Sequence, residues 1–221
     1  MKNNRQYAVL GLGIFGSTVS KTLSKYNCDV VAIDRDMECV QRLADIVHIA
    51  IQGDITDINV LRNAGVGDCD VAIIATGSHL EESLLCILHL KEMGVPVIIA
   101  KAKNKQHRRI LEKMGVTKVV SPEKEMGIQT AKTLLNRNII DTKDLDEEYS
   151  IIEINVPKSW IGKSLIELNV RNRFQLNIIG IRLENNHLDI TPSPRHIFNK
   201  NEHLLFLSSS DTITQLEFLE K

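Results

Sequence analysis

Apolar runs that end in glycine, alanine or an acidic residue recur along the first 120 residues of the chain. They are rich in β-branched residues and apolar at successive positions, which is typical of strands buried on both faces of a parallel sheet. The runs occupy residues 7–11, 30–34, 47–51, 71–75, 95–100 and 118–120. Segments of helical length separate them, most clearly residues 14–26, 80–93 and 105–114. This alternation predicts an α/β fold, a Rossmann-like doubly wound parallel sheet.

The pattern changes after residue 120. Residues 121–123 (Ser-Pro-Glu) have the features of a helix start, with an N-cap, a proline at the first helical position and an acid in the first turn. We expect this helix to end near residue 135 or 138. Residues 141–148 are polar and acidic without an apolar period, which indicates a linker.

The tail predicts a second, smaller α+β domain. Its expected strands are residues 149–156, 177–183, 188–191 and 203–208, and its expected helices are residues 161–168 and 212–219. The predicted organisation is therefore an N-terminal domain over residues 1–120, a crossover helix with an acidic linker over 121–145, and a C-terminal domain over 146–221.

Composition excludes several classes of protein. The 221 residues carry 27 Lys and Arg against 28 Asp and Glu, and this near-neutral balance argues against a mainly electrostatic binder of nucleic acid or membranes. No apolar stretch approaches about 18 residues, and no apolar segment with a cleavage site opens the chain, so we expect neither a transmembrane helix nor a signal peptide. The four cysteines form no CxxC pair, which is typical of reduced thiols in the cytoplasm.

A glycine-rich turn follows the first expected strand and opens the first expected helix. Gly11, Gly13 and Gly16 have the GxGxxG spacing of nucleotide-binding turns. The first glycine permits a tight turn, the second lets a phosphate approach the backbone, and the third lets the helix pack closely on the strand. Asp34 ends the second strand, where a carboxylate accepts hydrogen bonds from ribose hydroxyls and repels a 2′-phosphate. We therefore expect an adenine nucleotide other than NADP. The neighbouring Arg35 argues against this expectation, because an arginine at this place can bind a 2′-phosphate.

Further candidates end later strands, where sheets of this kind bind their ligands. Asp54, beside Gly53, is expected either to contact the adenosine or to cap a helix over residues 56–64. Residues 75–77 (Ala-Thr-Gly) are expected near the phosphates or a second sugar, with a simple helix-capping turn as the alternative. Two lysines that end the fifth strand are candidates to meet a polyphosphate, or are plain surface residues.

Residues for catalysis are not found in recognisable arrangements. None of the seven histidines has a catalytic setting, and no Tyr-x-x-x-Lys pair supplies the proton relay that hydride transfer needs. The HExxH, GxSxG and P-loop motifs are absent. We therefore expect a binding protein and not an enzyme. An NAD-dependent oxidoreductase is the alternative function, and a redox-sensing transcription regulator would need a helix-turn-helix that the chain does not display.

Four features in a fixed order resemble one family. They are the GLGxFG turn, the acid that ends the second strand, a GDxT step at residues 53–56 and a PEKEMG helix start at residues 122–127. Together with a tail similar to the TrkA-C domain, they resemble the RCK family, the regulators of potassium conductance. Within that family the chain is similar to the cytosolic gating subunits of Ktr-type potassium transporters. The resemblance covers nearly the whole chain and implies a switching protein that controls K⁺ uptake.

The resemblance also implies ligands and partners. Gating subunits of this type form dimers that assemble into an octameric ring, bind no nucleic acid, and dock on a dimeric membrane subunit at the cytoplasmic face of the cell membrane. ATP favours the activated ring and ADP the inactive one, whereas NAD(H) is the weaker candidate ligand. Glu123 is implied to hold Mg²⁺, Ca²⁺ or Na⁺ near the γ-phosphate between protomers, although the helix dipole alone also explains an acid in a first turn.

One position departs from the family pattern. Ile14 stands where many members have an arginine, so one side-chain contact to phosphate or adenine is in doubt. The candidate nucleotide-binding set is Gly11, Gly13, Ile14, Phe15, Gly16, Asp34, Arg35, Gly53, Asp54, Ala75, Thr76, Gly77, Lys101 and Lys103.

The tail resembles the domain that binds cyclic di-AMP at a dimer interface in this family. Arg171 is the expected phosphate partner, because its planar guanidinium group binds phosphate in a bidentate way. The alternative is that the matching residues only form the core of the tail and a dimer contact. The matching positions are Leu165, Ile166, Leu168, Arg171, Asn177, Ile178 and Pro194.

Overall fold

The chain folds into two compact units, Met1–Glu123 and Lys124–Lys221. The structure, a computed structural model, describes residues 5–77, 79–135, 138–146, 148–174 and 176–209. Each unit has its own sheet and its own hydrophobic core. Within the described residues, no helix combines the length and the apolar character that crossing a bilayer requires.

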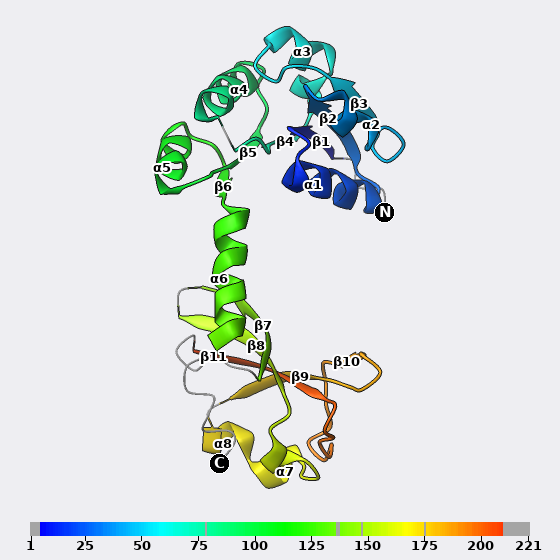
Figure 1. Ribbon diagram of the computed structural model, residues 1–221, viewed down its shortest axis with the longest axis vertical. Coiled ribbons are helices and arrows are strands. Elements are labelled where there is room, and N and C mark those ends of the chain that lie inside the picture. Colours follow the sequence, from blue (N-terminus) through cyan, green and yellow to red (C-terminus); the bar gives the residue numbers. More distant parts are fainter. Residues whose placement is uncertain (1–4, 78, 136–137, 147, 175, 210–221) are drawn as a thin grey trace. The chain divides into compact units, whose positions relative to one another are not determined.

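The first unit is built on a six-stranded parallel sheet of order β3-β2-β1-β4-β5-β6 (Figure 1). Its strands are β1 Gln6–Leu10, β2 Asp29–Asp34, β3 Ile49–Gln52, β4 Val71–Ile74, β5 Val97–Lys101 and β6 Lys118–Val120. The chain starts in the middle, reaches one edge at β3, and then fills the other half from β4 to β6. This arrangement confirms the predicted Rossmann-like doubly wound fold. It also puts the reversal of strand order between β1 and β4, where such sheets form a ligand-binding crevice.

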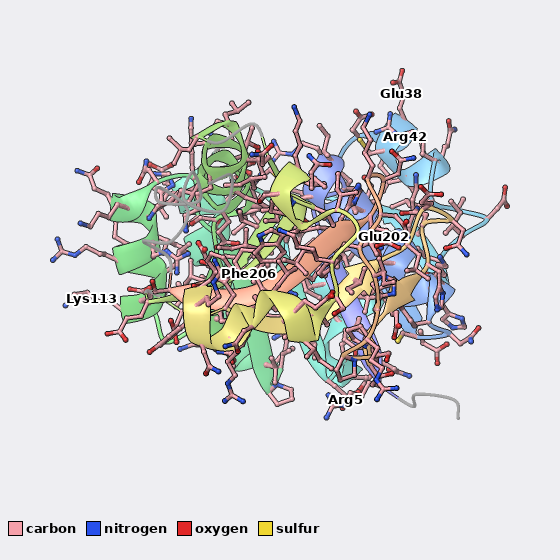
Figure 2. The ribbon with its side chains drawn as sticks, turned by 90° about the horizontal axis from the view of Figure 1, so that it is seen from below. Arg5, Glu38, Arg42, Lys113, Glu202 and Phe206 are labelled. Atoms are coloured by element: carbon pink, nitrogen blue, oxygen red, sulfur yellow. The ribbon has the colours of Figure 1, made fainter. Side chains whose placement is uncertain are left out.

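Helices cover both faces of this sheet. Successive side chains of a strand point to opposite faces, so each face of the sheet has its own hydrophobic core. In β1, Ala8 and Leu10 pack with residues of α3, α4 and α5, whereas Val9 packs with residues of α1 and α2. The helices are α1 Ile14–Lys25, α2 Met37–Gln41, α3 Ile58–Asn63, α4 Leu80–Glu92 and α5 Lys105–Lys113, with a 3-10 turn at Val66–Asp68. The short α2 escaped the sequence analysis. It has one buried side chain, Val40, while Glu38 and Arg42 project outward at this helix (Figure 2).

The second unit contains a five-stranded sheet of order β10-β9-β11-β8-β7, with antiparallel neighbours throughout. The strands are β7 Ile139–Asp144, β8 Tyr149–Asn155, β9 Asn177–Arg182, β10 Leu188–Asp189 and β11 His203–Ser209. Its helical segments are α6 Pro122–Leu135, which begins at the last residues of the first unit, a 3-10 turn at Lys158–Trp160, α7 Leu165–Leu168 and α8 Val170–Phe174. The predicted smaller α+β domain is thus confirmed as a class of fold.

Aromatic side chains fill the core of the second unit. The Trp160 ring lies 5.2 Å from the Phe174 ring and 5.9 Å from the Phe198 ring, measured between centroids. Trp160, Phe198 and Phe206 are almost entirely buried, and Phe206 contributes from the middle of β11 (Figure 2). Trp160 is the single tryptophan of the chain, so its fluorescence reports on this core.

The first half of the acidic segment predicted to be a linker, residues 141–144, belongs to a strand. Residues 139–144 form β7, which pairs with β8 at the edge of the sheet. Ile139 and Thr142 are buried, whereas Asp141 and Asp144 are exposed. An edge strand needs only one apolar face, and charges on it discourage pairing with other chains. The linker prediction was wrong because an edge strand lacks the apolar run by which the sequence analysis recognised strands.

Two other predictions for the tail have different outcomes. The helix expected over residues 161–168 is shortened to α7, because Gly162 adopts a positive φ of 81° and the extended Ser164 starts the helix with a capping box to Glu167. The expected helix over residues 212–219 lies outside the described residues.

Adding a side-chain methyl group at Gly16 is expected to destabilise the first unit. A Cβ on Gly16 would lie 1.9 Å from the carbonyl oxygen of Gly11 and 3.0 Å from the Cβ of Ala75. Forcing a methyl group into such a contact shifts the helix or the strand, so we expect Gly16→Ala to lower the free energy of unfolding by about 2–3 kcal/mol. Urea unfolding followed by far-UV circular dichroism measures this loss. Gly13→Ala is the matched control, because a Cβ at Gly13 meets nothing within 4 Å.

A buried ion pair ties three strands of the second sheet together. Glu153 on β8 accepts hydrogen bonds from Nε and Nη2 of Arg182 on β9, at 2.7 and 3.0 Å. Its Oε1 also lies 3.1 Å from Nδ1 of His203 on β11, the strand between them. The Arg182 hydrogen bonds hold the pKa of Glu153 below its ordinary value of 4.5. The carboxylate therefore stabilises the fold only while it is charged.

Glu153→Gln is expected to lower the free energy of unfolding of the second unit by about 1.5–3 kcal/mol at neutral pH, since hydrogen bonds to a charged partner are lost. Because the folded pKa is the lower one, this contribution is complete above pH 4.5 and disappears as the pH falls through the folded pKa. Urea unfolding followed by Trp160 fluorescence should therefore show a difference between wild type and variant that shrinks in acid. A constant difference would contradict the assignment, and the exposed Glu184→Gln is the control.

Candidate nucleotide-binding site

The turn between β1 and α1 is shaped by a glycine with a positive φ. Gly11 has φ 94°, and a Cβ there would lie 2.6 Å from Cγ2 of Thr76. Its backbone N–H donates to the carbonyl of Ile33 at 2.8 Å, and the N–H of Ala75 donates to the carbonyl of Leu10 at 2.8 Å. These bonds join the ends of β1, β2 and β4. Gly11 is therefore required both by the turn and by the close approach of the residues after β4.

Gly13 leaves an opening at the start of α1. It is the N-cap of this helix, it is exposed, and no side chain caps the helix end. The first turn of a helix has backbone N–H groups without helical partners and a positive partial charge. The site thus has the two properties that favour an anion.

Asp34 is fixed beside this turn by two backbone groups. The N–H of Leu12 donates to its Oδ2 at 2.5 Å, and the N–H of Asp36 donates to its Oδ1 at 2.9 Å. Each carboxylate oxygen has a second lone pair, so both oxygens can still accept a hydrogen bond from a hydroxyl group. The carboxylate is therefore oriented before any ligand arrives.

A pocket of about 520 Å³ opens where these strands end. This volume lies in the range of small-molecule sites. The structure gathers nine of the predicted residues around it: Gly11, Gly13, Asp34, Ala75, Thr76, Gly77, Lys101, Lys103 and Glu123. The hydroxyl oxygen of Thr76 is buried in this wall and has no hydrogen-bond partner within the described part of the chain. A buried hydroxyl without a partner is costly, which favours a ligand that satisfies it.

Lys101 dominates the basic wall of this pocket. Its ammonium nitrogen lies 2.5 Å from Oε1 of Glu123 and 6.0 Å from the centroid of the Phe15 ring. The Lys101 side chain is mostly buried, whereas that of Glu123 is exposed. The hydrogen bond from Lys101 lowers the pKa of Glu123, so the carboxylate is charged at neutral pH. Lys101 therefore has an exposed acidic partner, and its ammonium group lies above the Phe15 ring that follows the glycine turn.

Glu123 does not form a cation site within one chain. Mg²⁺ and Ca²⁺ take six or more oxygen ligands, whereas this single carboxylate already pairs with an ammonium group. No cluster of three or more His, Cys, Asp or Glu side chains suited to a metal occurs among residues that the structure describes. Because the cation was expected between two protomers, the role of Glu123 in holding it stays a prediction.

A second cavity of about 240 Å³ adjoins the first and shares Gly11, Asp34 and Thr76 with it. Two of the predicted residues, Arg35 and Gly53, line only this cavity. The sequence analysis missed its other polar residues, His79 and Glu82. Nothing in the local sequence marked them, because only the folded chain brings them to the cavity, as the contact of Glu82 with Arg35 shows. The remaining lining residue is Ile55.

Four predicted residues lie outside both cavities. The Ile14 side chain is 91% exposed, Phe15 packs against the α1–α2 core, and Gly16 lies beneath the turn. Asp54 turns back on Thr56, accepting from its N–H at 2.8 Å and from its hydroxyl at 2.7 Å. The helix cap expected from Asp54 is instead provided by Asp57, which accepts from the N–H of Asn59. The helix-cap alternative for Asp54 was therefore wrong, whereas its contact with an adenosine stays a prediction.

The second unit has its own hollow of about 460 Å³. It gathers five of the seven predicted tail residues: Leu165, Ile166, Arg171, Asn177 and Ile178. Leu168 is buried in the core instead, and the Pro194 carbonyl accepts from the N–H of Ile166 at 3.1 Å. The analysis missed the lining residues Asn169, Val170 and Leu176. The hollow combines a guanidinium group with apolar walls.

Fold and pockets define the class of this molecule: a Rossmann-like domain followed by a small antiparallel β-sheet domain. Residues 7–122 match the TrkA-N domain family, and residues 150–219 match the TrkA-C domain family. The chain therefore belongs to the RCK family of TrkA-N and TrkA-C domain proteins, as the sequence features indicated.

Relatives in this family are similar over nearly their whole length. The chain is 33% identical to the Ktr system potassium uptake protein C of Bacillus subtilis over 213 residues, which cover 96% of both proteins. It is 34% identical to the Ktr system potassium uptake protein A of the same organism over 216 residues, 97% of this chain and 96% of that one.

A solved structure has the same fold. The crystal structure of the GsuK RCK domain superposes with a TM-score of 0.66 at 20% identity, over 98% of this chain and 48% of that one. This chain thus spans about half the length of that RCK-domain chain. At this identity the likeness concerns the fold alone.

Gly13→Ala is expected to weaken the binding of ADP at least tenfold, because the added methyl group points into the pocket where the backbone must approach a phosphate. The free energy of unfolding should change by less than about 1 kcal/mol, which separates this variant from Gly16→Ala. Isothermal titration calorimetry with ADP measures the loss. Unchanged affinity would mean that phosphate does not contact this turn.

Proposed function

We propose that this protein is the nucleotide-sensing regulatory subunit of a Ktr-type potassium uptake system. The observation that carries the proposal is the 520 Å³ pocket, in which a glycine turn, an uncapped helix start, a fixed carboxylate and two lysines converge. The identity of 33–34% with Ktr system potassium uptake proteins supports the transport system in which the subunit acts.

The proposed ligands of the first unit are ATP and ADP. The α1 N-terminus and Gly13 suit the α- and β-phosphates, and Asp34 suits the ribose hydroxyls. Lys101 and Lys103 line the same pocket, where a further phosphate brings additional negative charge. Thr76 offers a hydroxyl group that has no partner among the described residues. A nucleoside polyphosphate thus satisfies each unpaired feature of the pocket.

Switching follows from the difference between the two nucleotides. A ligand shifts a conformational equilibrium only if it binds two states with different affinity. The γ-phosphate supplies such a difference because it competes with Glu123 for the ammonium group of Lys101. Glu123 belongs to the first turn of α6, so the competition acts directly on the start of that helix. ATP is proposed to favour the activated state and ADP the inactive one.

The second unit is proposed to bind cyclic di-AMP. Its hollow combines Arg171, suited to a phosphodiester, with the apolar side chains of Leu165, Ile166 and Ile178, suited to the faces of adenine rings. This ligand is proposed to bias the protein toward the inactive state. Coupling between the two ligands must then be reciprocal.

The protein is proposed to work as a homo-oligomer, in which dimers form an octameric ring docked on a dimeric membrane subunit at the cytoplasmic face of the cell membrane. The apolar surface of α6 supports self-association, since Met126, Ile128, Leu134 and Leu135 are all exposed. Exposed apolar side chains grouped on one element mark interaction surfaces. A cytoplasmic, peripheral location follows from that docking.

Calorimetry of wild type and two variants tests both sites at once. Asp34→Asn is expected to reduce ATP and ADP affinity at least tenfold and to leave cyclic di-AMP binding unchanged, because the ribose loses a charged acceptor. Arg171→Ala should do the reverse. Equal effects of both variants on both ligands would contradict two separate sites.

A separate assay tests the alternative function, an NAD-dependent oxidoreductase. Steady NADH turnover with a panel of carbonyl compounds would favour that alternative.

A further inference from the structure

An ion pair borders the smaller cavity of the first unit. Nη2 of Arg35, which directly follows β2, lies 2.6 Å from Oε1 of Glu82 in the first turn of α4. Both residues line the cavity together with Asp34. The Glu82 side chain is 22% exposed and that of Arg35 is 59% exposed, so the acid is the more fixed partner.

The position of Arg35 has a chemical consequence in this fold. In Rossmann-type sites, an acid at the end of the second strand binds the ribose 2′-hydroxyl, and a nearby arginine accommodates a 2′-phosphate. This chain has both residues side by side, Asp34 and Arg35. Which of them decides the specificity depends on whether the guanidinium group is available.

The guanidinium group of Arg35 donates a hydrogen bond to the carboxylate of Glu82, so this donor is already engaged. Asp54 and Asp34 add negative charge near the same guanidinium group. A 2′-phosphate entering this cavity would have to displace the Glu82 carboxylate and then lie beside two carboxylates. Rejection of the wrong ligand by an occupied partner and by like charge is a general route to specificity.

We propose that Glu82 determines the nucleotide specificity of this site, by holding Arg35 away from the ribose so that 2′-phosphorylated adenine nucleotides are excluded. The inference rests on the proposed function, since it assumes that the ribose of an adenine nucleotide binds beside Asp34. It assigns a role to a residue that is remote in sequence from the glycine turn and the ribose-binding acid.

The test compares two nucleotides that differ only by the 2′-phosphate, ADP and 2′-phosphoadenosine 5′-diphosphate, by calorimetry on the full chain. Glu82→Gln removes the charge and keeps the shape of the side chain. We expect it to raise the affinity for the 2′-phosphorylated nucleotide at least tenfold while ADP affinity changes less than twofold. Adding Arg35→Ala should abolish the gain. Glu81→Gln is the matched control, an exposed acid on the same helical turn.

The outcomes separate the inference from the proposed function. If Glu82→Gln and Glu81→Gln raise the affinity equally, net charge explains the effect and the role of Glu82 is overturned. A gain that survives Arg35→Ala, or an unchanged ratio of the two affinities, also overturns it while ADP binding stands. If wild type binds neither nucleotide, the proposed function fails and the inference fails with it.

Discussion

The close packing of α1 against the ends of β1 and β4 is the contact on which the first unit depends. Only a hydrogen at Gly16 allows the helix to lie against the Gly11 carbonyl and Ala75. This contact directs the start of α1 at the crevice between the two halves of the sheet. Gly11 in turn lies against Thr76, so the glycine turn, Ala75 and Thr76 meet at the wall of the pocket.

Charged side chains around the pocket are held by partners before a ligand arrives. Asp34 is fixed by backbone N–H groups, Lys101 by Glu123, and Arg35 by Glu82. The first of these orients an acceptor, whereas the other two place an acid in competition with a phosphate. Preorganised groups cost little to order on binding, and competing acids make affinity depend on the charge of the ligand. This arrangement underlies the proposal that the site distinguishes nucleotides by the number and position of their phosphates.

The second unit stands on its own core and its own polar network. Trp160 and its aromatic neighbours fill the interior, and Glu153 joins β8 to β9 and β11 through Arg182 and His203. Its hollow uses residues from α7, α8 and the start of β9, none of which belong to the first unit. The two units therefore have separate hydrophobic cores, and each has its own hollow.

The sequence alone determined the strand and helix pattern of the first unit, because a strand buried on both faces appears in the sequence as a continuous apolar run. It also determined the glycine turn and Asp34, since a turn and a strand end are local features. The edge strand β7 escaped it, because one buried face and an exposed acidic face carry no strand-like apolar run. Only the tertiary structure brought Glu82 to Arg35 and Glu123 to Lys101, across 47 and 22 residues. No local pattern encodes such pairs, since their distance is decided by how strands and helices pack.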